Sequence, residues 1–195
     1  MSGPKMARRE IEIETERLLL RLFRPQDLDE VSRILGDTLV TRYLNGGKPM
    51  PRERVEIFLK RSREFWDAHG FGQFALVHKE AGRLVGYCGF TFLDETCEVE
   101  LFYGLARERW NQGLVTEAAK ACLRFAFEET TLERIVAIAE HANVGSHRVM
   151  EKAGMRYEKE VRHQDTDVVS YFITRAEFRA DSSPYILTLS QSKDV

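Results

Sequence analysis

Two hydrophobic periods follow one another between residues 98 and 129. Residues 98–105 begin with alternating polar and apolar positions and continue as an apolar run, which predicts a strand. Residues 106–112 are polar, and from 113 to 129 the apolar positions recur at helical spacing. The pattern predicts a strand, a turn and a helix, and the unpaired N–H groups of the first helical turn form a potential anion site.

The next segments extend this unit. Residues 132–139 are almost continuously apolar, which is typical of a strand buried in a parallel sheet. Strand, crossover helix and second strand together predict a right-handed βαβ unit. A further helix is expected to begin at Asn143, an ordinary N-cap residue, and to stop at Gly154.

The N-terminal half predicts one strand and two helices. Residues 14–23 alternate as a strand, and Asp27 can cap the next helix with Glu30 as its capping-box partner. Pro51 opens a second helix that ends near residue 70. We expect residues 1–11 and 181–195 to be tails outside the folded domain.

Two hairpins complete the pattern, one at residues 74–93 and one at 157–174. Gly86 and Gly89 lie inside the second strand of the first hairpin, where glycine is unusual, and they predict a bulge or a close approach by another group.

Composition excludes several classes of protein. The chain has 195 residues, 43% of them hydrophobic, with a net charge of −2 and interleaved signs, so we expect one domain without a nucleic-acid-binding stripe. No apolar run approaches the ~20 residues that cross a membrane. Its three cysteines, Cys88, Cys97 and Cys122, predict buried reduced thiols of a cytoplasmic protein, and no spacing suggests a metal site.

Three segments resemble one enzyme family. The run WNQGLVTEA at 110–118 resembles the acetyl-CoA loop of the GNAT acetyltransferase superfamily, and is most similar to the RimJ/RimL branch of ribosomal-protein N-terminal acetyltransferases. The run NVGSHRVMEKAGM at 143–155 resembles a second signature of that branch, and TERLLLR at 15–21 resembles its opening. The resemblance covers about residues 12–178.

This resemblance implies an α/β (α+β) GNAT fold in a single domain over residues 12–178. The sheet would be mixed, mostly antiparallel and twisted, with about seven strands and about four flanking helices. It would splay at the central parallel pair, where the family strand carries a bulge past Glu100.

The resemblance also implies acetyl-CoA as cosubstrate. The pyrophosphate would lie on backbone N–H groups of five consecutive residues: Gln112, Gly113, Leu114, Val115 and Thr116. The backbone of Leu105 would meet the pantetheine arm and stabilise the oxyanion, and Asn143 and Ser146 would contact the arm near the sulfur. Asn111 and Val115 stand where the family commonly has small residues, but neither removes an N–H donor.

Two residues are candidates for proton transfer. Amines must be neutral to attack a thioester, so a carboxylate base is useful, and Glu100 near the implied bulge is our candidate. Glu98 points the same way but is better explained as a solvated strand residue, an explanation that also stays open for Glu100. Ser146 could protonate the leaving thiolate, although water could replace it.

The acceptor is the least constrained part of the prediction. By branch resemblance the leading acceptor is a protein N-terminal α-amine, with a small amine such as a polyamine, antibiotic or amino acid close behind. Aromatic and apolar residues that could line its pocket, or pack in the core instead, are Phe23, Tyr43, Leu44, Phe65 and Trp66. A non-catalytic acyl-CoA sensor and a plain nucleotide-binding protein remain as other classes, and exposed edge strands are compatible with a homodimer.

Overall fold

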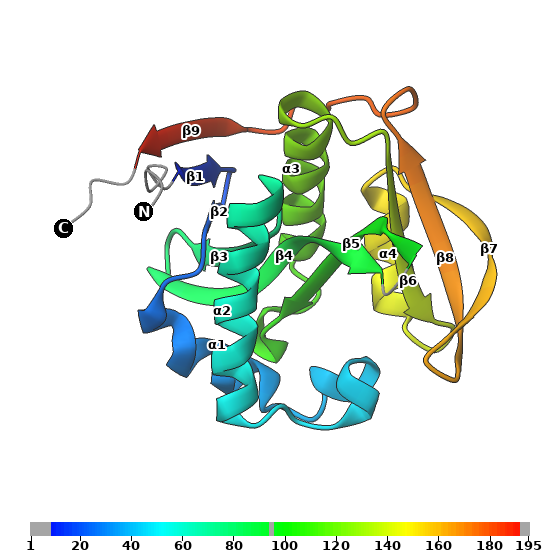
Figure 1. Cartoon of the computed structure of the whole chain (residues 1–195), viewed down its shortest axis with the longest axis horizontal. Helices are drawn as coiled ribbons and strands as arrows, with labels where there is room; N and C mark the ends of the chain where they lie inside the picture. The colour runs from blue at the N-terminus through cyan, green and yellow to red at the C-terminus, as the bar shows by residue number, and fades with distance from the viewer. Residues whose placement is uncertain (1–8, 94–95, 192–195) are drawn as a thin grey trace, which may run out of the picture.

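The computed structural model describes residues 9–93 and 96–191, which form one nine-stranded sheet and four α-helices (Figure 1). The strands are β1 (Arg9–Glu14), β2 (Leu18–Arg21), β3 (Gln73–His78), β4 (Arg83–Leu93), β5 (Glu98–Leu105), β6 (Arg134–Glu140), β7 (Arg156–His163), β8 (Thr166–Thr174) and β9 (Ile186–Gln191). The α-helices are α1 (Leu28–Leu35), α2 (Arg52–His69), α3 (Leu114–Glu129) and α4 (Val144–Lys152). Short 3-10 helices are η1 (Pro25–Asp27), η2 (Thr41–Tyr43), η3 (Asn45–Gly47) and η5 (Arg107–Arg109).

The sheet opens at its one parallel junction. Its strand order is β7-β8-β6-β5-β4-β3-β2-β1-β9, and β5 and β6 run parallel while their neighbours are antiparallel. Among the described residues, the β5–β6 register consists of one pair, Glu100 opposite Val136. Helix α3 is the crossover between these two strands. The predicted mixed sheet, splayed at its central parallel pair, is therefore confirmed.

The bulge that the family resemblance implied in β5 is not where we expected it. The β4–β5 ladder runs from Gly86–Leu105 to Leu93–Glu98 without a register shift. The shift lies between β3 and β4, at Leu76/Val77, near Gly86. The opening therefore forms because β6 leaves β5 after one register pair, while β5 stays on β4.

The glycines of β4 mark close backbone approaches, as their pattern predicted. A Cβ on Gly89 would lie 2.2 Å from the carbonyl oxygen of Gly72, and one on Gly86 would lie 2.3 Å from that of Gly104. Neither position can hold a side chain without moving a neighbouring strand or loop.

Both expected tails contribute to the sheet, which corrects the sequence prediction. β1 and β9 pair antiparallel along six residues each and lie side by side at one edge (Figure 1). In β1, Ile11 and Ile13 are buried between glutamates, a strand alternation that the sequence already contained. The predicted strand at 14–23 is likewise divided, because Thr15 closes a turn by exchanging hydrogen bonds with Leu18.

Helices cover both faces of the sheet. Along β4, Tyr87 belongs to a cluster with α1 and the first half of α2, whereas Cys88 and Phe90 belong to the larger cluster with α3 and α4. Since successive side chains of a strand point to opposite faces, the two helix pairs lie on opposite sides of the sheet. Glu100 and Phe102 of β5 share the α1/α2 face, and Leu101 and Tyr103 share the α3/α4 face.

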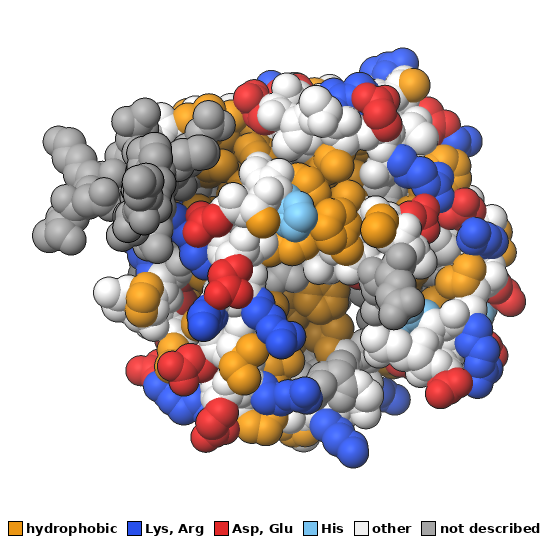
Figure 2. All heavy atoms as spheres, viewed as in Figure 1, with side chains coloured by type: hydrophobic (Ala, Val, Ile, Leu, Met, Phe, Trp, Pro, Cys, Tyr) orange, Lys and Arg blue, Asp and Glu red, His pale blue; other side chains and the backbone are white. Residues whose placement is uncertain are grey.

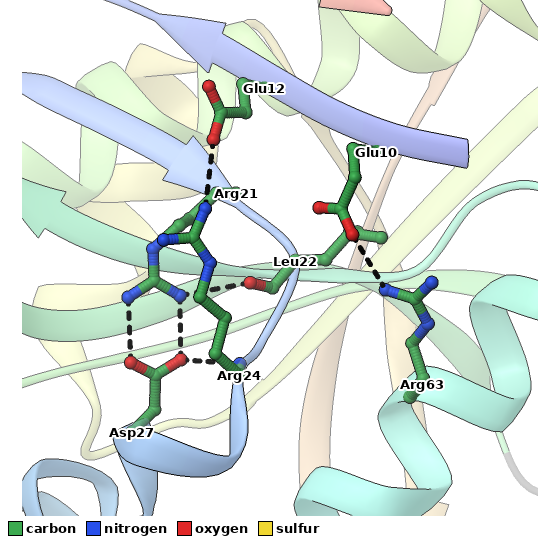
Figure 3. A network of polar contacts seen from close by, with 7 residues as sticks. All are labelled: Glu10, Glu12, Arg21, Leu22, Arg24, Asp27 and Arg63. Carbon is green, nitrogen blue, oxygen red and sulfur yellow. Dashed lines mark hydrogen bonds and ion pairs between the residues drawn. The ribbon is translucent and has the colours of Figure 1, made fainter. Parts of the chain in front are cut away.

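An ion-pair network fixes α1 and α2 to the N-terminal strands (Figure 3). Buried Asp27 accepts two hydrogen bonds of 2.7 Å from Arg21 of β2 and one of 2.8 Å from the Arg24 backbone N–H. Arg63 of α2 lies 3.8 Å from Glu10 of β1. Asp27 is therefore an anchor between sheet and helix, and its side chain makes no N-cap bond to α1, contrary to our prediction.

The cysteines only partly follow the prediction. Cys88 and Cys122 are buried free thiols, but Cys97 is exposed. Burial and a hydrogen bond with Cys88 raise the pKa of Cys122. Within the described residues, no helix has the length and apolarity needed to cross a membrane.

Candidate active site

The loop before α3 holds two residues with left-handed backbone. Gly113 has φ = 77° and Asn111 has φ = 59°. Asparagine is among the few non-glycine residues that adopt this conformation readily, so Asn111 can replace the family's glycine without refolding the loop. The first helical hydrogen bond runs from the Glu117 N–H to the Gly113 oxygen, so the N–H groups of residues 114–116 precede the hydrogen-bonded helix.

The side chains of Leu114 and Val115 pack on the core, whereas Thr116 lines the cavity at the start of α3. Leu114 is buried in the core, and Val115 packs against the same cluster. The candidate anion site at the start of α3 would therefore consist of backbone N–H groups and the helix dipole, and Val115 removes none of these N–H groups.

Arg17 and Glu117 brace this loop. Glu117 accepts hydrogen bonds from the Thr15 hydroxyl at 2.6 Å, from the Arg17 N–H at 2.8 Å and from the Arg17 Nε at 2.8 Å. Arg17 also donates to the carbonyl oxygen of Gln112 at 2.8 Å. Burial alone would raise the pKa of Glu117, but these bonds outweigh it, so the pKa lies below the ordinary value.

A basic cavity of about 380 Å³ adjoins the start of α3. Its lining includes Gly113 and Thr116, and its cationic residues outnumber its acidic ones. The cationic residues are Arg17, Lys120, Arg124, Lys152 and Arg179, and the acidic residues are Glu16, Glu117 and Asp181. The hydrogen bond from Lys120, with those from Ser183, lowers the pKa of Asp181 at its rim to about 2. Positive charge beside free N–H groups suits a ligand with several phosphates.

Leu105 lies at the open edge of β5. The next N–H, that of Ala106, donates to the Val85 oxygen on the β4 side at 2.8 Å. Because successive N–H groups point to opposite sides of a strand, the Leu105 N–H faces the opening toward β6. The Leu105 carbonyl oxygen accepts a hydrogen bond of 2.9 Å from the Trp110 indole, which ties this edge to the loop before α3.

Helix α4 closes the same opening. The Asn143 side chain accepts a hydrogen bond from the Ser146 N–H at 3.2 Å, so Asn143 is the N-cap. The Tyr103 hydroxyl of β5 donates to the Ser146 backbone oxygen at 3.2 Å, and burial raises the pKa of Tyr103. These two hydrogen bonds place Asn143 and Ser146 beside β5, at Tyr103, two residues before Leu105.

The two candidate carboxylates differ in their surroundings. Glu98 is partly exposed and forms an ion pair of 3.2 Å with Arg134, which agrees with a structural role. Glu100 is only 9% exposed and lies at the last β5–β6 register pair, where the strands separate. Of the two, Glu100 is the carboxylate placed at the opening.

A second cavity, of about 520 Å³, lies beside α2 on the Glu100 face. Phe65, which the sequence left as a pocket or core residue, lines this cavity and also packs against the core. Trp66 and Phe23 are buried instead, and the Trp66 indole donates to the Gln73 oxygen, so these two serve the core. Tyr43 donates to the Ala142 oxygen at 3.2 Å, which links η2 to the start of α4.

Sequence patterns missed several of these residues. Arg17 and Glu117 are 100 positions apart, and single-sequence reading has no signal that pairs them. Tyr103 could have been found, because strand alternation places it on the face of α3. Arg54 and Arg61 of α2, which line the cavity beside that helix, have the sequence pattern of ordinary surface charges on a helix. Within the described residues, no group of three potential metal ligands exists.

Comparison with known proteins identifies the family of the chain. The model of the acetyltransferase (GNAT) domain family matches residues 17–156. The uncharacterized N-acetyltransferase YnaD of Bacillus subtilis (strain 168) is 30% identical over 148 residues, which cover 75% of this chain and 83% of YnaD.

Solved structures show the same fold. A GNAT-family acetyltransferase from Bacillus anthracis is 30% identical, with a TM-score of 0.73, and the match covers 85% of this chain and 99% of that one. RimL, a ribosomal L7/L12 alpha-N-protein acetyltransferase in complex with coenzyme A, superposes with a TM-score of 0.71 at 13% identity, covering 82% and 95%. At that identity the second likeness shows the fold alone.

Proposed function

The chain belongs to the GNAT acetyltransferase family and is an acyltransferase, and we propose that it transfers the acetyl group of acetyl-CoA to a protein N-terminal α-amine. The observation that carries this proposal is the free N-terminus of α3 beside the open edge of β5, with Glu100 at the point where β5 and β6 separate. In this proposal, phosphate binding, the thioester cleft and the base belong to one site.

In this proposal the chain binds acetyl-CoA largely through its backbone. N–H groups of residues 112–116 bind the pyrophosphate, and the cationic cavity beside them takes further phosphate. The edge of β5 at Leu105 pairs with the pantetheine arm, next to Asn143 and Ser146 on α4. These groups fit the cosubstrate, which supplies the thioester.

Three residues share the chemistry. Glu100 accepts the proton that the acceptor amine loses as its nitrogen bonds to the acetyl carbon. The Leu105 N–H donates to the thioester oxygen, where negative charge grows as the amine adds to the carbonyl carbon. When this tetrahedral intermediate collapses, the C=O bond re-forms, the carbon–sulfur bond breaks and the charge passes to the sulfur. Ser146, or a water molecule beside it, returns a proton to the sulfur. The products are an acetylated amine and the free thiol.

The choice of a protein N-terminus rests on the segments 110–118 and 143–155, which resemble the RimJ/RimL branch. A small primary amine is the second candidate acceptor. It is favoured by the cavity beside α2, whose volume of about 520 Å³ lies in the range typical of small-molecule sites. Fold alone does not choose between these acceptors.

Calorimetric titration with acetyl-CoA, CoA and ATP in parallel tests the donor site. We expect micromolar binding of acetyl-CoA and CoA, weaker binding of ATP, and at least a ~100-fold loss in Gly113→Asp, which places a carboxylate at the α3 N-terminus. Circular dichroism of the variant checks that it remains folded.

Acetyl transfer is then followed by mass spectrometry on N-terminal peptides and small primary amines. Acetylation of any of these amines supports the acyltransferase reaction, and a preference for peptides supports the N-terminal acceptor. ATP binding tighter than CoA binding, or the same CoA affinity in Gly113→Asp, would contradict the donor site.

A further inference from the structure

Helix α2 presents two different faces. Val55, Leu59 and Trp66 are buried in the core. Another set of α2 residues lines the cavity beside the helix, and its members are Arg54, Ile57, Phe58, Arg61, Ser62 and Phe65. These residues recur at spacings of three and four, so they form one stripe along the helix.

The cavity lies beside the proposed base. Thr91 of β4 lines the cavity and is directly opposite Glu100 in the β4–β5 register. Side chains of directly opposed residues project from the same face of a sheet, with Cβ atoms about 5 Å apart. An acceptor held in the cavity would therefore have its amine close to Glu100.

The charged residues that line the cavity beside α2 are all positive. Arg54 and Arg61 line the cavity, and none of the described lining residues is acidic. Across the described residues, neither arginine has an ion-pair or side-chain hydrogen-bond partner, whereas Arg52 of the same helix is paired with Asp29 at 2.6 Å. Figure 2 shows an apolar hollow next to α2, with Lys and Arg side chains along the helix side of its rim.

Two buried polar atoms of the cavity also lack partners. Gln73 is 7% exposed, and neither its Oε1 nor the Oγ of Ser62 has a hydrogen-bond partner in the described structure. Leaving a buried polar atom unpaired is costly, so such groups commonly mark a place where a ligand completes the hydrogen bonds. A donor N–H of an occupant would satisfy Gln73.

We propose that this cavity selects acceptor amines that carry an apolar group and a carboxylate. The amine lies toward Glu100, the apolar group contacts Phe58 and Phe65, and the carboxylate pairs with Arg54 and Arg61. Polycationic acceptors such as polyamines meet like charge instead. The inference rests on the proposed function and adds the class of acceptor to it.

Matched acceptors test the proposal. C-terminally amidated Ala-Phe-Glu-Glu and Ala-Phe-Lys-Lys form the peptide pair, and phenylalanine and 2-phenylethylamine form the small-molecule pair. We expect a preference of about 10-fold or more in kcat/KM for the carboxylate-bearing member, expressed mainly in KM, as for an added charge-assisted hydrogen bond. The pair that is acetylated faster identifies whether the carboxylate comes from a peptide or a small amine.

Two variants separate the arginines from other effects. The double variant Arg54→Gln/Arg61→Gln should lose the preference, because kcat/KM for the carboxylate-bearing acceptors should fall toward the values for 2-phenylethylamine and the lysine peptide. The control Arg52→Gln, whose arginine is paired outside the cavity, should keep the preference.

Equal or faster acetylation of the lysine peptide or of 2-phenylethylamine would overturn the acceptor class while the acyltransferase reaction stands. The proposed acceptor class would also be overturned if the protein acetylates other N-terminal peptides or small primary amines but none of these four probes. Loss of acetyl-CoA binding in the calorimetric titration would instead overturn the proposed function.

Discussion

The two faces of the sheet build their parts of the site in different ways. On the α3/α4 face, the proposed ligand contacts are mainly backbone N–H groups at Leu105 and at the start of α3, with cationic side chains in the adjoining cavity. Leu114 is buried and Val115 packs against the core. On the α1/α2 face, the cavity is formed by side chains of α2, β3 and β4.

This difference explains what a single sequence can reveal. A backbone site needs special conformations, such as the left-handed residues Asn111 and Gly113, and these restrict which amino acids can occur. A side-chain cavity needs only a stripe along a helix, which any amphipathic pattern can supply. The donor site is therefore recognisable in the chain, and the acceptor site is not.

The largest expected effect comes from breaking the anchor of the α1/α2 face. Asp27→Ala leaves the Arg21 guanidinium, whose side chain is 11% exposed, without its carboxylate. Because an unpaired buried charge is strongly unfavourable, we expect the free energy of unfolding to fall by about 3–5 kcal/mol. Urea unfolding of the variant beside the wild type measures this loss.

Two further variants sharpen that result. Glu30→Ala removes a carboxylate from a more exposed pair with Arg33 and should cost under about 1 kcal/mol. Replacing both partners, as in Arg21→Met/Asp27→Leu, should recover much of the stability, because no buried charge remains unpaired. Equal losses in Asp27→Ala and Glu30→Ala would show that the buried network does not anchor the face.

The second-largest expected effect is on kcat, and it is tested by comparing Glu100 and Glu98, two carboxylates of β5. If Glu100 is the base, Glu100→Gln should lower kcat by about 100-fold or more and leave acetyl-CoA affinity unchanged. Glu98→Gln removes the partner of Arg134 and should change kcat by less than about 3-fold. Steady-state kinetics with calorimetry on each variant separates turnover from binding.

An unchanged kcat in Glu100→Gln would remove Glu100 from the mechanism. A protein that binds acetyl-CoA but acetylates no amine, with or without Glu100, would instead behave as an acyl-CoA sensor. These two outcomes are told apart by the wild-type protein, which acetylates an amine in the first case and none in the second.

Much of the central fold could be predicted because its patterns are local. The alternation in β5, the helical period of α3 and the apolar run of β6 each indicate one element, and their order specifies the βαβ unit. The edge pair β1–β9 was missed, although β1 alternates. Its partner lies about 175 residues away, and only tertiary pairing makes either segment a strand.

The same reason limits the site prediction. Asn143 could be recognised as a cap because its partner, Ser146, is three residues away. The partners of Arg17 and Asp27, which are Glu117 and Arg21, could be identified only from the structure. Asp27 fitted a local capping pattern, but the guanidinium of Arg21, with two hydrogen bonds of 2.7 Å, took its carboxylate instead.

The smallest effect tests the ion pair between Arg17 and Glu117, which holds the loop before α3. Glu117→Gln removes the charge that holds Arg17 over the loop before α3. Charge-assisted hydrogen bonds of this kind contribute about 2 kcal/mol, so at pH 7 the variant should be less stable by about that amount. Acetyl-CoA affinity should fall with it, because Arg17 also holds the Gln112 carbonyl.

The pH dependence distinguishes a charge effect from a packing effect. The pKa of Glu117 is lower in the folded protein than the ordinary value of 4.5, so its stabilisation is fully present above pH 4.5 and is lost as the pH falls through the folded pKa. The stability gap between wild type and Glu117→Gln should therefore be full at pH 7 and close as the pH is lowered well below 4.5. Thermal unfolding at both pH values measures the gap, with the exposed Glu64→Gln showing little gap at either. A gap of the same size at both would mean that Glu117 acts through its shape, and the brace would then not be electrostatic.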